Sequence, residues 1–270
     1  MATRLLAIDL DGTLLTGERT PHPENVLALK RASEAGIQIV LASGRIAASV
    51  RDFSDKLGLD QAMICSNGGH VQGLLGEELL HLSLDRKAID ITLGYTSQAG
   101  VHTSVYTRDQ LYFLGDSEWG DMYRQRVRIV KPEISTVEAA KQMNVLKIIL
   151  IDQPSQIKQH RVELEKVLDQ SIAALTESEP EYLEVLSAEA NKGKGLQVLS
   201  ESMGLQQHET AAIGDYLNDL EMIQWAGVGA AMGNAVEELK SAANMIMPTN
   251  EEAGVARFID YLIERNDRLG

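Results

Sequence analysis

The chain is poor in the features that mark secreted and membrane proteins. Its one cysteine, Cys65, cannot form an internal disulfide, so nothing indicates an oxidising compartment. No apolar run approaches the roughly 18 residues that cross a bilayer, and the first residues lack the pattern of a signal peptide. We therefore expect a cytoplasmic protein with no membrane partner.

Positive charge is also scarce. The 270 residues include 25 Lys and Arg against 39 Asp and Glu, which gives a formal net charge of −14. Such a chain repels the phosphates of DNA and RNA, so we expect no nucleic-acid partner, although a local basic pocket for a small anion is compatible with it. The length and the 44% hydrophobic share accommodate one large domain or two modest ones.

Short apolar strands alternate with helical segments at both ends of the chain, which indicates βαβ units and a parallel sheet. The middle differs, because strand pairs there are mixed with helices, as in an antiparallel sheet with helices on one face. We therefore predict a doubly wound α/β core, residues 1–82 and 188–270, interrupted by an α+β insert, residues 83–187. The expected strands are 4–10, 37–42, 62–65, 211–214, 228–232 and 245–247 in the core, and 101–106, 110–114, 145–151, 172–176 and 182–186 in the insert.

The strongest chemical signal follows the first strand, at residues 9–13, DLDGT. Ligands bind at the carboxyl edge of open α/β sheets, where Asp9 would emerge. On an extended segment Asp9 and Asp11 point the same way, and Gly12 allows a sharp turn. One carboxylate can act as a nucleophile on phosphorus and the other as a general acid and base. A solvated acidic turn is the alternative interpretation.

Two further clusters carry groups that suit a phosphate. Ser43 and Gly44 end the second strand, where a hydroxyl and free backbone N–H groups could bind an anion; Arg45 could add charge or form a surface ion pair. The segment NKGKG, residues 191–195, opens a helix, and either Lys192 or Lys194 could neutralise a phosphate and keep a nucleophilic carboxylate ionised. An ordinary helix cap and a solvated basic loop are the simpler interpretations of each alone.

The fourth cluster is GDYLND, residues 214–219, after another short strand. Asp215 at the strand end, with Asn218 and Asp219 one turn on, suits Mg²⁺, which prefers oxygen ligands and one or two carboxylates. A capped helix start is the alternative. We expect all four clusters to converge at the edge of the predicted parallel sheet where its strands end.

With these motifs the sequence resembles the haloacid dehalogenase superfamily, and within it the Cof-type phosphatases, along its whole length. The resemblance is carried by residues 9–13, by SGR at 43–45, by KG at 192–193 and by GD…ND at 214–219. Smaller matches are SNGG at 66–69, LEV at 183–185 and AMGNA at 231–235. It implies a Rossmann-like core with a type C2B (IIB) cap. Tyr216 departs from the pattern, because relatives usually carry a small or polar residue there.

The resemblance implies a role for each site residue. Asp9 would be the nucleophile and a Mg²⁺ ligand, Asp11 the general acid and base and a ligand through its backbone carbonyl, and Asp215 a third ligand. Lys192, chosen here over Lys194, would hold the phosphoryl group. Asn218 and Asp219 would orient Lys192 or metal-bound water. The implied phosphate-binding residues are Ser43, Gly44, Lys192 and Asn218.

The function expected from this resemblance is Mg²⁺-dependent hydrolysis of small phosphorylated metabolites, such as sugar phosphates, FMN or pyridoxal phosphate, through an aspartyl-phosphate. A phosphosugar mutase shares both aspartates and is one alternative. A non-catalytic regulator that binds a phosphorylated metabolite is another. We expect a monomer or homodimer.

Overall fold

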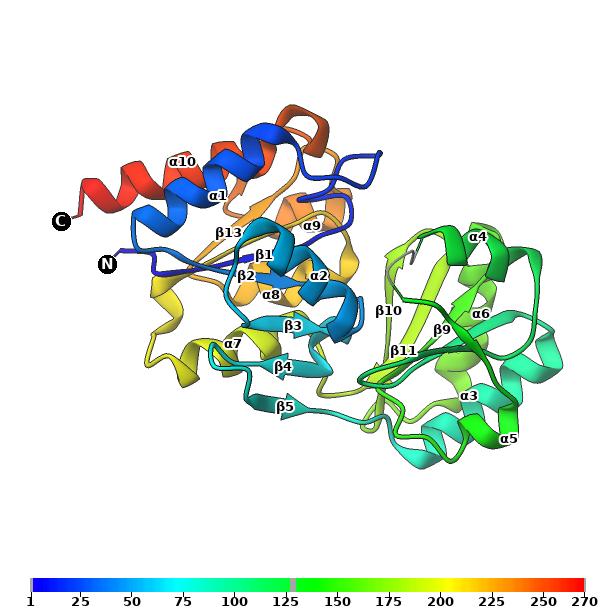
Figure 1. Cartoon of the computed structure of the whole chain (residues 1–270). Helices are drawn as coiled ribbons and strands as arrows, with labels where there is room; N and C mark the ends of the chain where they lie inside the picture. The colour runs from blue at the N-terminus through cyan, green and yellow to red at the C-terminus, as the bar shows by residue number, and fades with distance from the viewer. Residues whose placement is uncertain (1, 127–129, 270) are drawn as a thin grey trace.

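The computed structural model describes residues 2–126 and 130–269 and contains two β-sheets (Figure 1). The first sheet is parallel from β14 to β3 and ends in an antiparallel extension of β4 and β5. Its strand order is β14 (Met245–Ile246), β13 (Val228–Ala231), β12 (Thr210–Gly214), β1 (Leu5–Ile8), β2 (Gln38–Ala42), β3 (Met63–Cys65), β4 (His70–Gln72) and β5 (Glu78–His81).

Helices cover both faces of this sheet, as a doubly wound fold requires (Figure 1). Continuous apolar strands such as β1, which is buried along its whole length, are what two covered faces favour. One face carries α1 (Pro23–Glu34), α2 (Ala47–Leu57) and α10 (Gly254–Asp267); the other carries α7 (Lys192–Ser202) and α8 (Leu220–Trp225), and α9 (Glu237–Ala242) precedes β14.

The second sheet belongs to the middle of the chain and lies beside the carboxyl edge of the first (Figure 1). Its strand order is β10 (Ala173–Glu179), β11 (Tyr182–Ser187), β9 (Lys147–Ile151), β6 (His102–Tyr106), β7 (Leu111–Phe113) and β8 (Glu133–Ile134). The helices of this part are α3 (Arg86–Ala99), α4 (Glu118–Arg126), α5 (Val137–Ala140) and α6 (Pro154–Val167). We call this part the cap and the first sheet with its helices the core.

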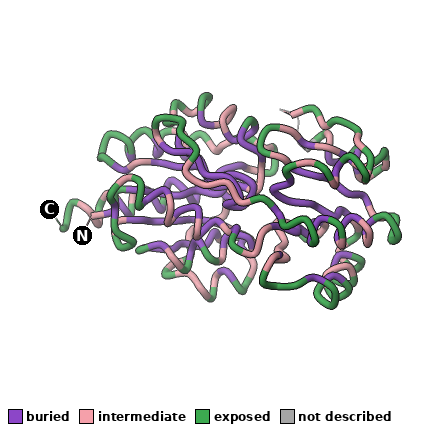
Figure 2. The backbone as a smooth tube through the Cα atoms, turned by 90° about the horizontal axis from the view of Figure 1, so that it is seen from below, coloured by how far each residue is buried: buried purple, intermediate pink, exposed green. Residues whose placement is uncertain are grey.

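The two faces of the cap sheet have different partners. Along β9, Ile148 and Leu150 pack with residues of α3 and α6, whereas Ile149 and Ile151 pack in a second cluster that includes Ile46 of the core. This alternation follows the two-residue period of a strand. One face of the cap sheet therefore builds the cap interior and the other is turned to the core; Figure 2 shows buried backbone running through both sheets.

The predicted fold class is confirmed, and several local expectations were incomplete. The cap sheet is not wholly antiparallel, because β7 and β8 pair in parallel. Helix α3 and the β4–β5 hairpin had not been expected, and α7 begins at Lys192, inside the segment 191–195 that was predicted to open a helix. The chain passes to the cap between β5 and α3 and returns between β11 and α7, while the domain boundaries 1–82, 83–187 and 188–270 stay a prediction. Within the described residues, no helix is both long and apolar enough to cross a membrane.

Candidate active site

Asp9 is the first polar side chain after β1 and is only 5% exposed. Gly12 turns the chain beside it with a φ of +83°, which favours glycine. A Cβ atom at Gly12 would lie 2.3 Å from Oδ2 of Asp215, so the first and fourth motifs approach each other through the space that glycine leaves. The structure therefore brings Asp9 and Asp215 together from opposite ends of the chain.

Lys192 joins them from the start of α7. The side chain of Asn191 caps this helix by accepting from the Lys194 N–H, which leaves the ammonium of Lys192 directed into the core. Nζ donates to Oδ1 of Asp9 and to Oδ1 of Asp219, each at 2.6 Å, and Lys192 is fully buried. Burial alone would lower the pKa of Lys192, but the two carboxylates outweigh it and raise that pKa, so the ammonium stays charged.

Three carboxylates form a cluster, and two of them contact this ammonium. One oxygen from each of Asp9, Asp215 and Asp219 lies within 4.8 Å of the others. Burial and the neighbouring carboxylates raise the pKa of Asp9 well above its ordinary value, against the influence of Lys192. Burial and Asp219 raise the pKa of Asp215 to about 7. The cluster is therefore short of positive charge, and its oxygen donors suit a divalent cation such as Mg²⁺.

The three carboxylates have different surroundings. Both carboxylate oxygens of Asp219 already accept hydrogen bonds. Oδ1 accepts from Lys192, and Oδ2 accepts from the backbone N–H groups of Asp215 and Tyr216, at 3.0 and 3.3 Å. Asp215 accepts from the hydroxyl of Thr13 at 2.7 Å. Asp9 and Asp215 are thus the better metal ligands, and Asp219 is suited to holding Lys192 and the loop in place.

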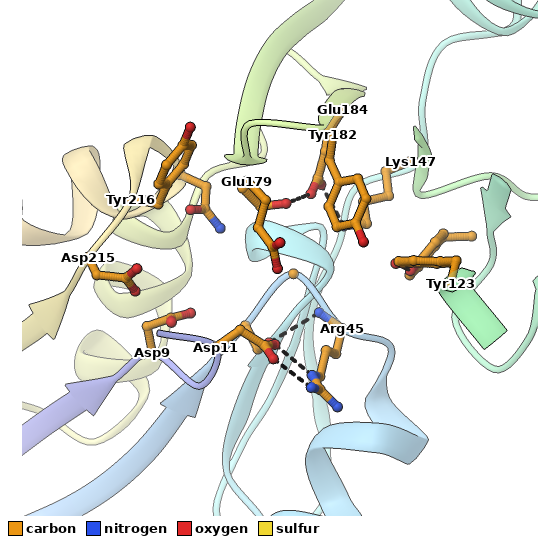
Figure 3. Close-up of a pocket in the computed structure, with 15 residues that line it drawn as sticks. Asp9, Asp11, Arg45, Tyr123, Lys147, Glu179, Tyr182, Glu184, Asp215 and Tyr216 are labelled. Atoms are coloured by element: carbon orange, nitrogen blue, oxygen red, sulfur yellow. Dashed lines mark hydrogen bonds and ion pairs between the residues drawn. The ribbon is translucent and has the colours of Figure 1, made fainter. Parts of the chain in front are cut away.

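Asp11 lines the same cavity as Asp9, and its carboxylate forms an ion pair with Arg45. Its two carboxylate oxygens accept from Nε and Nη2 of Arg45, at 2.7 and 2.6 Å (Figure 3). A bidentate arginine–carboxylate pair fixes both distance and plane. Arg45 lines this cavity too and orients the Asp11 carboxylate through the ion pair.

Ser43 and Gly44 follow β2 and line the same cavity as Asp9. The Ser43 hydroxyl accepts from the Arg45 N–H at 3.2 Å, which leaves its own proton available to an anion. Asn218 also lines the cavity, but its amide donates to Oδ1 of Asn67 at 3.0 Å. The loop at Asn67, which the sequence offered only as a family match, is thus part of the site.

The cap covers the cavity and supplies residues that had not been predicted for the site, although Glu184 lies in the family match at 183–185. The space has a volume of about 60 Å³ and is lined by the core residues already named, by Tyr216, and by the cap residues Tyr106, Tyr123, Lys147, Ser178, Glu179, Tyr182 and Glu184 (Figure 3). One signal was available for Lys147, because a lysine begins the otherwise apolar strand KIILI. Nothing in the local sequence of Tyr106 indicates a place in the site.

Comparison with known proteins identifies the family. The model of the haloacid dehalogenase-like hydrolases matches residues 6–259. The chain belongs to this family. It is 31% identical to the 5-amino-6-(5-phospho-D-ribitylamino)uracil phosphatase YwtE of Bacillus subtilis (strain 168), over 96% of this chain and 98% of that protein. It is 30% identical to the pyridoxal phosphate phosphatase YbhA of Escherichia coli (strain K12), with the same coverage.

A solved structure supports the fold of this haloacid dehalogenase-like hydrolase. The subclass IIB sugar phosphatase BT4131 superposes with a TM-score of 0.88 over 96% of this chain and 98% of that one, at 21% sequence identity. The core with its inserted cap is thus the architecture of that subclass. With phosphatases as its relatives in sequence, the chain is an enzyme of the phosphatase type.

Proposed function

We propose that this hydrolase is a Mg²⁺-dependent phosphatase that cleaves small phosphate monoesters through an aspartyl-phosphate on Asp9. One observation carries the proposal: the buried carboxylate of Asp9 is held by Lys192, within a cation's reach of Asp215, in a cavity covered by the cap. A nucleophile, a fixed positive charge and a metal-binding carboxylate are the parts that phosphoryl transfer needs at one point.

In the first step an oxygen of Asp9 attacks phosphorus, and the bond between phosphorus and the ester oxygen breaks. Lys192 is hydrogen-bonded to Asp9, so it favours the ionised form of this carboxylate before attack and adjoins the phosphoryl group afterwards. The hydroxyl of Ser43 and the backbone at Gly44 face the same cavity and can donate to phosphoryl oxygens. Bound Mg²⁺, held by Asp9, Asp215 and the Asp11 carbonyl, would neutralise phosphoryl charge.

Asp11 is the group placed to move protons. It donates a proton to the departing ester oxygen and later takes one from the water that attacks the aspartyl-phosphate, which releases phosphate and restores Asp9. In the structure Arg45 holds its carboxylate at the rim of the cavity beside Asp9 (Figure 3). Arg45 therefore sets the direction from which Asp11 reaches the leaving group.

The site favours small metabolites over macromolecules, because the cap covers it. A neighbouring groove of about 380 Å³ shares Tyr123 and Tyr182 with the cavity and also contains Trp119, which gives space and apolar surface for a compact leaving group. Two relatives in sequence act on 5-amino-6-(5-phospho-D-ribitylamino)uracil and on pyridoxal phosphate, both small phosphate esters. We propose the same broad class here.

A panel of phosphorylated metabolites, with p-nitrophenyl phosphate as a generic ester, tests the proposal. With Mg²⁺ present we expect free phosphate from p-nitrophenyl phosphate and from at least one metabolite, and loss of release when EDTA removes the cation. Phosphorus NMR of the same mixtures reports rearranged esters. An isomer without free phosphate would identify a mutase instead, and tight binding without turnover across the panel would identify a binding protein.

A further inference from the structure

The cap contributes a buried ion pair to the active-site cavity. Lys147 begins β9 and Glu184 lies on the neighbouring strand β11; each is 1% exposed, and Nζ of Lys147 donates to Oε2 of Glu184 at 2.5 Å. Lys147 shares its face of β9 with Ile149 and Ile151, the face turned to the core. Both charged residues line the same cavity as Asp9.

This pair is bonded to the core. The amide of Asn67 donates to Oε2 of Glu184 at 2.7 Å, and the amide of Asn218 donates in turn to Oδ1 of Asn67 at 3.0 Å. Ser178 donates to the other oxygen of Glu184. Asn67 holds a φ of +54°, an uncommon value for a residue other than glycine. Hydrogen bonds therefore run from the cap through Asn67 to the loop that carries Asp215.

Lys147 also lies against the phosphate-binding loop. A Cβ atom built on Gly44 would be 3.2 Å from Nζ of Lys147, so a side chain at position 44 would crowd the ammonium. Within the part of the chain that the structure describes, Glu184 is the only hydrogen-bond acceptor of Nζ, although the ring of Tyr106 lies 4.6 Å away. An ammonium has three N–H donors, so two of them remain for a ligand in the cavity.

Cap stability alone is a weak reason for such a pair. Taking two charges out of water offsets much of their attraction, and apolar residues of similar size often stabilise a fold at least as well. The charge of the pair also limits the ligand. Glu184 neutralises Lys147 and Glu179 lines the same cavity, so the cap side does not favour a second anionic group. Free N–H donors without net charge suit a neutral oxygen acceptor.

We propose that Lys147 is a specificity-determining residue that donates a hydrogen bond to a hydroxyl or carbonyl oxygen on the leaving group of the ester held at Asp9. Glu184 fixes the ammonium in place and cancels its charge, which directs the selection toward neutral oxygen-bearing leaving groups. The inference rests on the proposed function and adds a residue that recognises the leaving group by a hydrogen bond. A site built to bond a substrate oxygen discriminates strongly against an analogue that lacks it.

The first test removes the pair as a unit, so that no buried charge is left alone. The double variant Lys147→Met/Glu184→Gln is compared with wild type on p-nitrophenyl phosphate and on ribose 5-phosphate, glucose 6-phosphate and pyridoxal 5′-phosphate. For the metabolite that wild type hydrolyses fastest, we expect kcat/KM to fall at least 10-fold, mainly through KM. Activity on p-nitrophenyl phosphate, whose leaving group has no hydroxyl or carbonyl oxygen, falls less, so the ratio of kcat/KM for the metabolite to kcat/KM for p-nitrophenyl phosphate falls at least fivefold.

Equal losses on both kinds of ester would show a structural role only and overturn the inference, as would unchanged activity on both. If wild type releases phosphate from no ester, the proposed function fails as well, so the two failures are distinguishable. Thermal unfolding of each protein checks that the cap remains folded.

A second variant keeps the inference testable if the double variant does not fold. Glu184→Gln keeps the shape of the side chain and an oxygen acceptor but leaves Lys147 with a net positive charge. We expect the kcat/KM ratio of fructose 1,6-bisphosphate to fructose 6-phosphate to rise at least fivefold, because an uncompensated ammonium now attracts the second phosphate. An unchanged ratio in the folded variant would contradict contact between Lys147 and the leaving group.

Discussion

At the scale of single residues, Lys192 has the clearest assignment. Two lysines stand two positions apart at the start of α7, and chemistry alone could not choose between them. The structure buries Lys192 between Asp9 and Asp219, whereas Lys194 takes part through its backbone N–H, which donates to Asn191. The pair therefore offers a substitution and its matched control in one helical turn.

Replacing Lys192 by Met should lower kcat for p-nitrophenyl phosphate by at least about 100-fold, because a fixed charge beside the reacting phosphoryl group is lost. Lys194→Met should keep kcat within about threefold. Steady-state phosphate release with Mg²⁺ measures both. Similar losses in the two variants would argue that the whole basic segment, rather than one ammonium, matters.

Gly12 permits a close approach that no other residue can make. Gly12→Ala meets both a positive φ and the carboxylate of Asp215, so we expect activity to fall at least 10-fold along with stability. Gly36→Ala is the matched control, because φ there is +77° yet no atom of the described residues lies within 4 Å of the added Cβ. It should cost about 1 kcal/mol of unfolding free energy and leave activity intact. Steady-state kinetics and urea unfolding of the two variants separate the clash with the Asp215 carboxylate from the backbone strain that both variants share. Equal activity in both variants would contradict the close approach of Asp215 to position 12.

At the scale of elements, β6 contains a buried histidine that makes the cap sensitive to acid. The ring of His102 packs edge-on against Phe113, with centroids 4.8 Å apart, and Nδ1 bonds with the hydroxyl of Ser117 at 2.7 Å. Burial, assisted by the charge of Arg124, lowers the pKa of His102 from 6.5 to about 4. The folded protein therefore holds this ring neutral where an unfolded chain would protonate it.

The unfolded chain binds this proton more tightly than the folded protein does. The contribution of the neutral ring to the free energy of unfolding is therefore complete above pH 6.5 and is lost as the pH falls toward 4. We expect the loss to reach up to about 3 kcal/mol, at 1.36 kcal/mol for each pKa unit. His102→Gln should have a flatter pH dependence, whereas His22→Asn, at an exposed helix start, controls for replacing an imidazole elsewhere. Urea unfolding at pH 7.0 and 4.5 measures the difference, and parallel pH curves for wild type and His102→Gln would exclude this role.

The elements were largely predictable where the local pattern was strong. Apolar runs such as residues 37–42 and 145–151 predict β2 and β9 because continuous burial requires them. The β4–β5 hairpin and α3 were not predicted, since β5 is only half-buried and the buried face of α3 mixes alanine and threonine with isoleucine and leucine. The pairing of β7 with β8 depends on tertiary packing, which no local pattern encodes.

The predictability of the site differs between its two halves. Core residues that follow strand ends, such as Asp9 and Asp215, could be placed because parallel strands end at one edge. The cap half, including Lys147 and Glu184, depends on how the two sheets face each other. The family match at 183–185 and the lysine that begins KIILI marked these residues, but neither showed that they face the core site. The pairing of Asp11 with Arg45 was not predicted for the same reason, since it depends on a partner 34 positions away.

At the scale of the whole molecule, the convergence of carboxylates links metal binding to stability. The raised pKa of Asp215, about 7, means that the folded protein without a cation binds a proton there more tightly than the unfolded chain does. The stabilisation that this proton gives the folded protein is complete below pH 4, near the ordinary pKa of an aspartate, and is lost as the pH rises through 7. Metal and proton thus compete for the same oxygens.

Mg²⁺ should therefore raise the melting temperature more at pH 8.0 than at pH 5.5. At a concentration 100 times its Kd, a ligand adds about 2.7 kcal/mol, which corresponds to several degrees for a chain of this size. Asp215→Asn should melt higher than wild type at pH 8.0 without metal and lose most of the Mg²⁺ response. Differential scanning fluorimetry measures this, and an equal Mg²⁺ shift in wild type and Asp215→Asn would count against the metal site.

The most direct measurement compares phosphate release by wild type and Asp9→Asn at saturating Mg²⁺, with Asp109→Asn, an exposed cap position, as the control. An amide of the same shape cannot form the aspartyl-phosphate, so the account predicts a loss of at least about 1,000-fold in kcat for Asp9→Asn and unchanged turnover for the control. Full activity of a folded Asp9→Asn protein would show that the nucleophile lies elsewhere.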